Sequence, residues 1–182
     1  MRRTALYASP LILALAACDG GNVVVDDPSD PEQIAAASAT LPQPEPGEYT
    51  GSMEISEFSM DGVEEEQQAL MRAAIEGMSG QERTTCITPE MAEEGYQEFL
   101  ANLNQGAEGC EFTSFTVEGD TLSADMQCDD DAGTSGTMQL TGTVTSTSQD
   151  MTVRMDMTDS AQNQTMRMTM RNQMERTGDC DA

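Results

Sequence analysis

The last third of the chain alternates apolar and polar side chains in three long runs, and no other feature constrains the fold as strongly. The runs are "TSGTMQLTGTVTS" at 134–146, "DMTVRMDMT" at 150–158 and "TMRMTMRNQM" at 165–174. A period of two residues is typical of a β-strand with one buried face. The pattern therefore predicts three strands whose methionine and aliphatic side chains share one face of a sheet.

One register of the last two runs satisfies both faces of this sheet. It makes three apolar pairs: Val153–Met170, Met155–Met168 and Met157–Met166. The same register puts Arg167 opposite Asp156, a cross-strand charge pair worth up to about 1 kcal/mol. For the preceding pair of strands we expect three contacts: Val144–Met151, Leu140–Met155 and Met138–Met157. This agreement predicts an antiparallel meander with one buried face.

The middle of the chain supplies further elements. We expect a first strand in "GEYTGSMEISEFSM" (47–60), a helix over 63–80, a short strand over 81–88, and a hairpin over 110–128 turning at Gly119-Asp120. A second helix is expected over 88–106, with Met91, Tyr96, Phe99, Leu100 and Leu103 facing inward. The predicted fold is α+β: an antiparallel β-meander of about five to seven strands with two helices packed on one face. It occupies a single domain over residues 47–182.

The N-terminus has the layout of an export signal. Arg2 and Arg3 precede an apolar run, Ala5–Ala17, which is too short to span a bilayer as a helix. The ending Leu15-Ala16-Ala17-Cys18 resembles the bacterial lipobox, in which the cysteine is lipidated and becomes the mature N-terminus. We therefore expect a signal peptide over residues 1–17 and a lipid on Cys18. The alternative is an ordinary signal peptide that leaves Cys18 as an odd thiol.

A lipid on Cys18 implies that the protein is anchored to a bacterial membrane and does not span it. We expect a position in the cell envelope facing the periplasm, and Asp19 slightly favours the inner membrane. Residues 18–46 are rich in Asp, Pro, Ala and Ser, with few bulky apolar side chains. They are predicted to form the lipidated N-terminus and a flexible, acidic, Pro-rich tether.

Four further cysteines, Cys86, Cys110, Cys128 and Cys180, suggest two disulfides in an exported chain. Three pairings are possible. Cys110 and Cys128 lie on the two arms of the expected hairpin. A three-residue loop puts them opposite each other, and a two-residue loop leaves them one residue out of register unless a bulge intervenes. Cys86 and Cys180 are then the remaining pair. A disulfide between them would close a long loop and stabilise the fold by about 4 kcal/mol. Free thiols that are redox-active or bind a metal are the alternative, although no C-x-x-C is present.

The charge balance excludes several classes of protein. The chain has 33 acidic residues, eight arginines, and neither lysine nor histidine, and its net charge is −25. Without residues 1–17, six arginines remain and the net charge is −27. Such a surface repels nucleic acid and anionic headgroups. The commonest general base and the Schiff-base and P-loop lysines are missing, so we expect neither an enzyme nor a cofactor.

Two features have the chemistry of a metal site, and each has a simpler explanation. Methionine thioethers suit Cu(I), but alternating methionines also fill the buried face of a strand, which we favour. Asp129–Asp131 could bind Ca²⁺, but adjacent carboxylates do not converge as spaced ligands do, so a solvated turn is favoured. A methionine-lined sheet could also bind a lipid or other apolar ligand in its concavity.

Several segments together resemble the domain of unknown function 3617 family of proteobacterial envelope proteins, here in a lipoprotein form. They are "PGEYTGSMEI", "TTCITPE", "CEFTSFTVEGDTLSADMQC" and the terminal "GDC". The resemblance covers Pro46–Cys180, and its most specific parts are Cys86–Glu90, the Cys110–Cys128 hairpin and Gly178–Cys180. The chain is more acidic than its relatives and has Phe or Ala where many carry a basic or Trp residue in the hairpin. The family has no assigned catalytic residues, so the resemblance implies a fold and a compartment.

We therefore expect a membrane-anchored periplasmic lipoprotein that works as a binding or interaction module. Its partner would be an unknown envelope protein or a small molecule, and not nucleic acid. The alternative function is a periplasmic carrier of an apolar small molecule or Cu(I). A roomy cavity under the sheet would favour the carrier, whereas a filled core would favour the interaction module.

Overall fold

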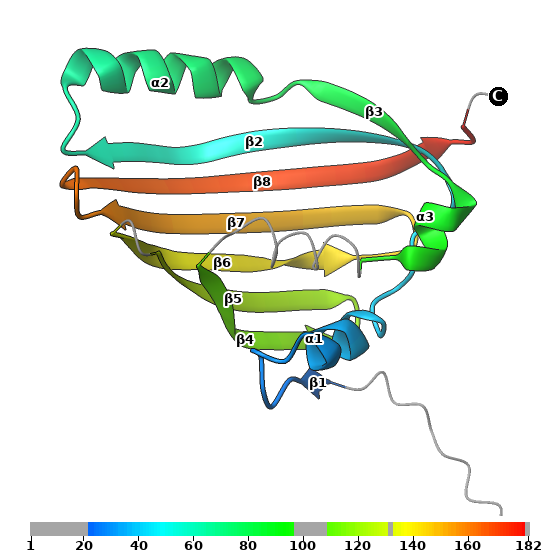
Figure 1. Cartoon of the computed structure of the whole chain (residues 1–182). Coiled ribbons are helices and arrows are strands. Elements are labelled where there is room, and N and C mark those ends of the chain that lie inside the picture. The colour runs from blue at the N-terminus through cyan, green and yellow to red at the C-terminus, as the bar shows by residue number, and fades with distance from the viewer. Residues whose placement is uncertain (1–21, 97–108, 131–132, 181–182) are drawn as a thin grey trace, which may run out of the picture.

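The computed structural model describes residues 22–96, 109–130 and 133–180. These residues form one eight-stranded antiparallel sheet with the strand order β1-β4-β5-β6-β7-β8-β2-β3 (Figure 1). The strands are β1 (Val23–Val24), β2 (Gly47–Asp61), β3 (Glu82–Ile87), β4 (Cys110–Glu118), β5 (Thr121–Asp129), β6 (Thr134–Val144), β7 (Ser148–Asp159) and β8 (Gln164–Gly178). The helices in the described part are α1 (Pro31–Ser38), α2 (Glu65–Met78) and α3 (Pro89–Glu94).

The predicted meander is confirmed, because β4 to β8 follow one another as antiparallel neighbours. The register of β7 against β8 is also confirmed, with Val153–Met170, Met155–Met168 and Met157–Met166 paired. Arg167 lies opposite Asp156, and its Nε is 3.2 Å from that carboxylate. A second nitrogen of the same guanidinium, Nη1, lies 2.8 Å from the Asp61 carboxylate on β2. Arg167 thus joins three strands on the polar face of the sheet.

The expected register of β6 against β7 is wrong by two residues. The structure pairs Val144 with Gln149, Leu140 with Val153 and Met138 with Met155. The turn closes early because the Thr145 hydroxyl accepts hydrogen bonds from the backbone N–H groups of Thr147 (3.2 Å) and Ser148 (2.9 Å). A shift of two residues keeps every side chain on its expected face.

One face of the sheet is lined by methionine and other apolar side chains, and we name it the methionine face. It carries Met53, Ile55, Phe58, Met60, Met126, Met138, Leu140, Met151, Val153, Met155, Met157, Met166, Met168, Met170 and Met174. Its β4–β6 end is the core, where Phe115, Val117 and Val144 are almost fully buried. Over β7, β8 and β2 its methionines are mostly only half-buried. The apolar face therefore extends beyond the packed core.

The segment expected to be a flexible tether is folded over its described part, residues 22–46. β1 pairs with β4, and Ile34, Ala37 and Leu41 are buried in the core. α1 begins at a favourable cap, because the Asp30 carboxylate accepts from the Glu32 N–H at 2.9 Å. Ile34 and Ala37 are three residues apart and lie on one helical stripe, and Leu41 follows the helix and packs into the same core. The expectation of a tether relied on overall composition, which conceals this stripe.

The expectation of two helices on one face is also wrong. α2 lies along the edge of β2, beyond the part of that edge that pairs with β3 (Figure 1). The Gly80 N–H donates to the Met53 carbonyl at 2.8 Å, and the Arg72 guanidinium donates to that of Phe58 at 2.9 Å. α2 thus covers backbone groups that an edge strand would leave open. Its Leu70 is 68% exposed, and the fold is predominantly β.

The second expected helix is shorter than predicted. α3 ends at Glu94, and the expected positions of Phe99, Leu100 and Leu103 lie outside the described residues. None of the helices in the described part is both long and apolar enough to cross a membrane. The signal peptide and the lipidation of Cys18 concern residues outside the described part and remain predictions.

The cysteines form two disulfides, Cys110–Cys128 and Cys86–Cys180. The β4–β5 turn has two residues, because Glu118 pairs with Thr121. A bulge between Phe112 and Ser114 then corrects the register, so that Cys110 lies opposite Cys128. The second disulfide ties the edge strand β3 to the end of the chain.

Candidate functional site

A cavity of about 410 Å³ lies at the end of the sheet where β2, β3, β7 and β8 meet α3. We name it the end cavity. Its lining residues are Pro44, Tyr49, Thr85, Ile87, Met91, Gly95, Tyr96, Ser148, Gln149 and Met174. Among the described residues, the lining is mostly apolar, with a few hydroxyl and amide groups and no charged side chain.

The sheet supplies the floor and one wall of the end cavity. Tyr49 of β2 pairs with Thr85 of β3, and Gly47 pairs with Ile87. Side chains of paired residues point to the same face, so Thr85 and Ile87 belong to the methionine face together with Tyr49. Met174 reaches the cavity from β8. The end cavity is therefore a continuation of the methionine face.

α3 supplies the opposite wall. Thr88 begins this helix, and its hydroxyl accepts from the Met91 N–H at 3.3 Å. Gly95 ends it in the left-handed region, with φ of +58°, which an L side chain rarely adopts. The chain turns there and places Tyr96 in the lining of the cavity.

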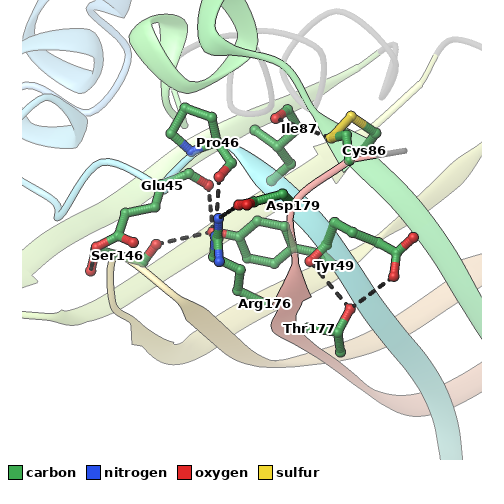
Figure 2. Close-up of polar contacts among 11 residues, drawn as sticks. Glu45, Pro46, Tyr49, Cys86, Ile87, Ser146, Arg176, Thr177 and Asp179 are labelled. Atoms are coloured by element: carbon green, nitrogen blue, oxygen red, sulfur yellow. Dashed lines mark hydrogen bonds and ion pairs between the residues drawn. A yellow bond between two sulfur atoms is a disulfide. The ribbon is translucent and has the colours of Figure 1, made fainter. Parts of the chain in front are cut away.

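Tyr49 holds the floor in place. It is 3% exposed, and its hydroxyl lies 2.8 Å from the Glu45 carbonyl oxygen and 3.0 Å from that of Ser146 (Figure 2). Burial raises the pKa of Tyr49, so the phenol is neutral at physiological pH and can donate to these carbonyls. The contact fixes the segment that carries Pro44 against the turn between β6 and β7.

Arg176 lies next to Tyr49 on the same face, and its hydrogen bonds are made within the chain. Its Nε donates to the Pro46 carbonyl at 3.0 Å, and Nη2 lies 2.6 Å from the Asp179 carboxylate (Figure 2). Gly47 makes room for this side chain, because a Cβ there would lie 2.5 Å from Arg176 Nε. Arg176 is therefore part of the frame around the end cavity.

Tyr96 differs from Tyr49 in its hydrogen bonding. Burial, followed by the proximity of Tyr49, raises the pKa of Tyr96 to about 12. Its hydroxyl makes no hydrogen bond within the part of the chain that the structure describes. Tyr96 therefore contributes a neutral phenol to the lining of the end cavity.

A second cavity of about 230 Å³ adjoins the first. It is lined by Gly51, Ser52, Met53, Gln81, Arg83, Thr85, Asn172 and Met174. We name it the arginine cavity. Thr85 and Met174 line both cavities, which makes the two spaces neighbours along β3 and β8.

The two metal candidates from the sequence have local packing roles. A Cβ at Gly136 would lie 2.7 Å from the Met157 sulfur, so this thioether packs over the glycine, and Met151 does the same at Gly142. The Asp130 carboxylate accepts from the Thr134 N–H at 2.7 Å and closes a turn. Asp131 lies outside the described residues. Within 22–96, 109–130 and 133–180, no group of three His, Cys, Asp or Glu side chains could hold a metal ion.

The sequence did not predict the end cavity. It predicted the strands that carry Tyr49 and Met174 but gave no reason to bring these two residues to one place. The missing signal was the β2–β3 register, which puts Thr85 and Ile87 beside Tyr49. The four cysteines were brought together as predicted, and the disulfide Cys86–Cys180 lies on the edge strand that walls the cavity.

The fold and site define a domain of one antiparallel sheet with a ligand-sized apolar cavity at one end. A family described as "Protein of unknown function (DUF3617)" matches residues 44–180, and the chain belongs to that family. The family resemblance seen in the sequence is thereby confirmed, and the lipoprotein form remains a prediction. No curated protein and no solved structure matches the chain. β1 and α1 lie N-terminal to the matched residues, although they complete the core.

Proposed function

We propose that this protein is a membrane-anchored envelope lipoprotein that binds a small apolar molecule in the end cavity and catalyses no reaction. The observation that carries the proposal is the cavity of about 410 Å³ with its mostly apolar lining. Small-molecule sites have volumes of about 300–1,000 Å³ and combine apolar walls with a few polar groups. Tyr96, Thr85 and Gln149 supply those polar groups here.

The cavity favours a carrier over a protein-interaction module, which was the first expectation from the sequence. The packed core lies at the β4–β6 end, while the β2–β3 end is hollowed. Met174 and Met91 line the hollow, and methionine adapts its shape to different apolar ligands. The described lining residues include no nucleophile with an adjacent base, which agrees with a binding role.

The proposed lipid on Cys18 would hold the domain close to the membrane. Only residues 19–22 separate Cys18 from β1, whose strand pairs with β4. Five steps of extended chain reach at most about 18 Å. An envelope location facing the periplasm, with the inner membrane favoured by Asp19, would then let the end cavity exchange apolar ligands with a nearby bilayer. Cys18→Ser should move the protein from the membrane fraction to the soluble fraction.

The binding proposal is tested with N-phenyl-1-naphthylamine, a neutral dye that fluoresces in apolar surroundings. The chain is used from Asp19 onward, which retains every described element and avoids detergent. We expect saturable binding with one site. Thr85→Trp should fill the space shared by the two cavities and weaken binding by about tenfold or more.

The matched control is Thr84→Trp. Thr84 is the neighbouring exposed residue on β3, and it lies on the opposite face of the sheet. Thr84→Trp should leave the affinity for the dye unchanged. Unsaturable binding, or equal affinity of the wild type and Thr85→Trp, would overturn the proposed function.

A further inference from the structure

Four of the six arginines outside residues 1–17 have partners in the chain. Arg72 donates to the Phe58 carbonyl, and the other three form ion pairs: Arg167 with Asp61 and Asp156, Arg171 with Asp150, and Arg176 with Asp179. Arg83 and Arg154 make no hydrogen bond or ion pair within the described part of the chain. In a chain with 33 acidic residues, two arginines that have no partner among the described residues need an explanation.

Arg83 lies at the cavities, whereas Arg154 does not. Arg83 is on β3 opposite Gly51, which in turn pairs with Met174 of β8, so the three share the methionine face. Arg83 lines the arginine cavity and is two residues from Thr85, which lines both cavities. Arg154 lies on the opposite, polar face of β7, between Gln139 and Thr169.

The local charge at the cavities is opposite to that of the whole protein. Among the residues that the structure describes, no carboxylate lines either cavity, and Arg83 is the one charged side chain in the two linings. The net charge of −25 repels anions at long range, but a contact pair with a guanidinium acts at short range. An apolar space with one cation at its side matches a molecule that has an apolar chain and one negative charge.

We propose that the ligand is a single-chain amphiphile with a carboxylate headgroup. Its chain occupies the end cavity, and its carboxylate binds Arg83 in the arginine cavity. A guanidinium presents paired donors that match the two oxygens of a carboxylate. Asn172 lines the same cavity and adds an amide donor. This assignment rests on the proposed binding function and deepens it.

A carboxylate fits the site better than a phosphate or a membrane surface. A phosphate monoester carries about −1.5 to −2 charges at neutral pH, which one arginine in an acidic protein leaves uncompensated. An anionic bilayer needs a cluster of basic side chains, whereas the described linings of the two cavities contain a single basic side chain, Arg83. A fatty acid carries the single charge that Arg83 balances.

The test compares dodecanoate with dodecanol, which have the same chain and differ in charge. Each displaces N-phenyl-1-naphthylamine from the chain that begins at Asp19, at concentrations below self-association and at a pH where dodecanoate is ionised. Wild type should bind dodecanoate about three- to tenfold more tightly than Arg83→Gln does, the range expected for an exposed charge pair. Dodecanol and the dye should bind both proteins equally. Arg154→Gln makes the same change of charge on the other face and should leave the affinity for dodecanoate unchanged.

The possible results separate this inference from the proposed function. If dodecanol and the dye bind but Arg83→Gln keeps the wild-type affinity for dodecanoate, the carboxylate assignment is wrong and the binding function stands. An equal loss of affinity for dodecanoate in Arg154→Gln would also overturn the assignment, because it would indicate a general effect of charge. If neither amphiphile nor the dye binds the wild type, both proposals fall.

Discussion

The hydroxyl of Tyr49 contacts the Ser146 carbonyl oxygen at 3.0 Å, although 97 residues separate the two in the chain. The same hydroxyl contacts the Glu45 carbonyl at 2.8 Å, so one phenol joins the floor of the end cavity to two segments of its surroundings. Tyr49→Phe keeps the ring and removes this junction. We expect a loss of about 1 kcal/mol in the free energy of unfolding, measured by chemical denaturation.

Tyr96→Phe is the control for this change, because the Tyr96 hydroxyl makes no hydrogen bond within the described residues. It should change the free energy of unfolding by less than about 0.5 kcal/mol. Equal effects of the two variants would show that the Tyr49 hydroxyl does not hold the floor in place.

Gly136 lies where no side chain fits. A Cβ there would lie 2.1 Å from the Asp156 carbonyl oxygen and 2.7 Å from the Met157 sulfur. Gly136→Ala should therefore destabilise the protein by about 1–3 kcal/mol through overpacking. Gly77→Ala in α2 meets nothing within 4 Å and should stabilise by up to about 1 kcal/mol, because alanine favours helix. Thermal unfolding of both variants checks the prediction, which a stable Gly136→Ala would refute.

The two disulfides close loops of very different length. Cys86 and Cys180 are separated by 94 residues, and Cys110 and Cys128 by 18. In the chain-entropy model the first bond contributes about 4.7 kcal/mol and the second about 3.2 kcal/mol. Replacing Cys86 and Cys180 by serine should therefore destabilise the protein more than replacing Cys110 and Cys128 by serine. The reverse order in denaturant titrations would contradict this prediction.

Asp150 makes the stability of the protein depend on pH in the acidic range. A hydrogen bond from Arg171 lowers the pKa of Asp150 below its usual value. A lowered pKa in the folded state gives stability that is present above the unfolded pKa and is lost as pH falls through the folded pKa. Unfolding measured across the acidic range should thus show a shallower loss of stability in Asp150→Asn than in the wild type.

Glu118→Gln is the control for that series. Glu118 is exposed at the β4–β5 turn and makes no ion pair within the described part of the chain. Its acid profile should follow that of the wild type. If Asp150→Asn also follows the wild type, the pair with Arg171 has no effect on stability.

Strands β2 to β8 and the β7–β8 register were predictable because side-chain alternation and charge agreed on one arrangement, whereas the eighth strand, β1, lies in the segment expected to be a tether and exceeds the predicted five to seven. The observed register pairs Met155 with Met168 on the methionine face and Arg167 with Asp156 on the polar face. Few other registers satisfy both faces at once. The β6–β7 register depended instead on how the Thr145 hydroxyl closes a turn. A local hydrogen bond of this kind leaves no periodic signal in the sequence.

The places of the helices and the end cavity could not be predicted, because they depend on how distant segments pack. α2 has an apolar stripe, but Arg72 binds the backbone of β2 and directs the helix to the sheet edge. α1 was concealed in a segment whose composition suggested disorder, although Ile34 and Leu41 complete the core. The end cavity needs both β3 on the edge of β2 and α3 above it, and neither position follows from periodicity.

The most direct test of ligand binding in the end cavity uses the methionine methyl groups as reporters. Methyl NMR spectra of protein labelled at methionine are recorded during titration with N-phenyl-1-naphthylamine. Met174 and Met91 line the cavity and should show the largest shifts, saturating with the dye, whereas Met126 in the packed core and Met60 at the far end of β2 should not move. Shifts confined to Met126 and Met60, or no saturable shift at Met174 and Met91, would contradict the proposal.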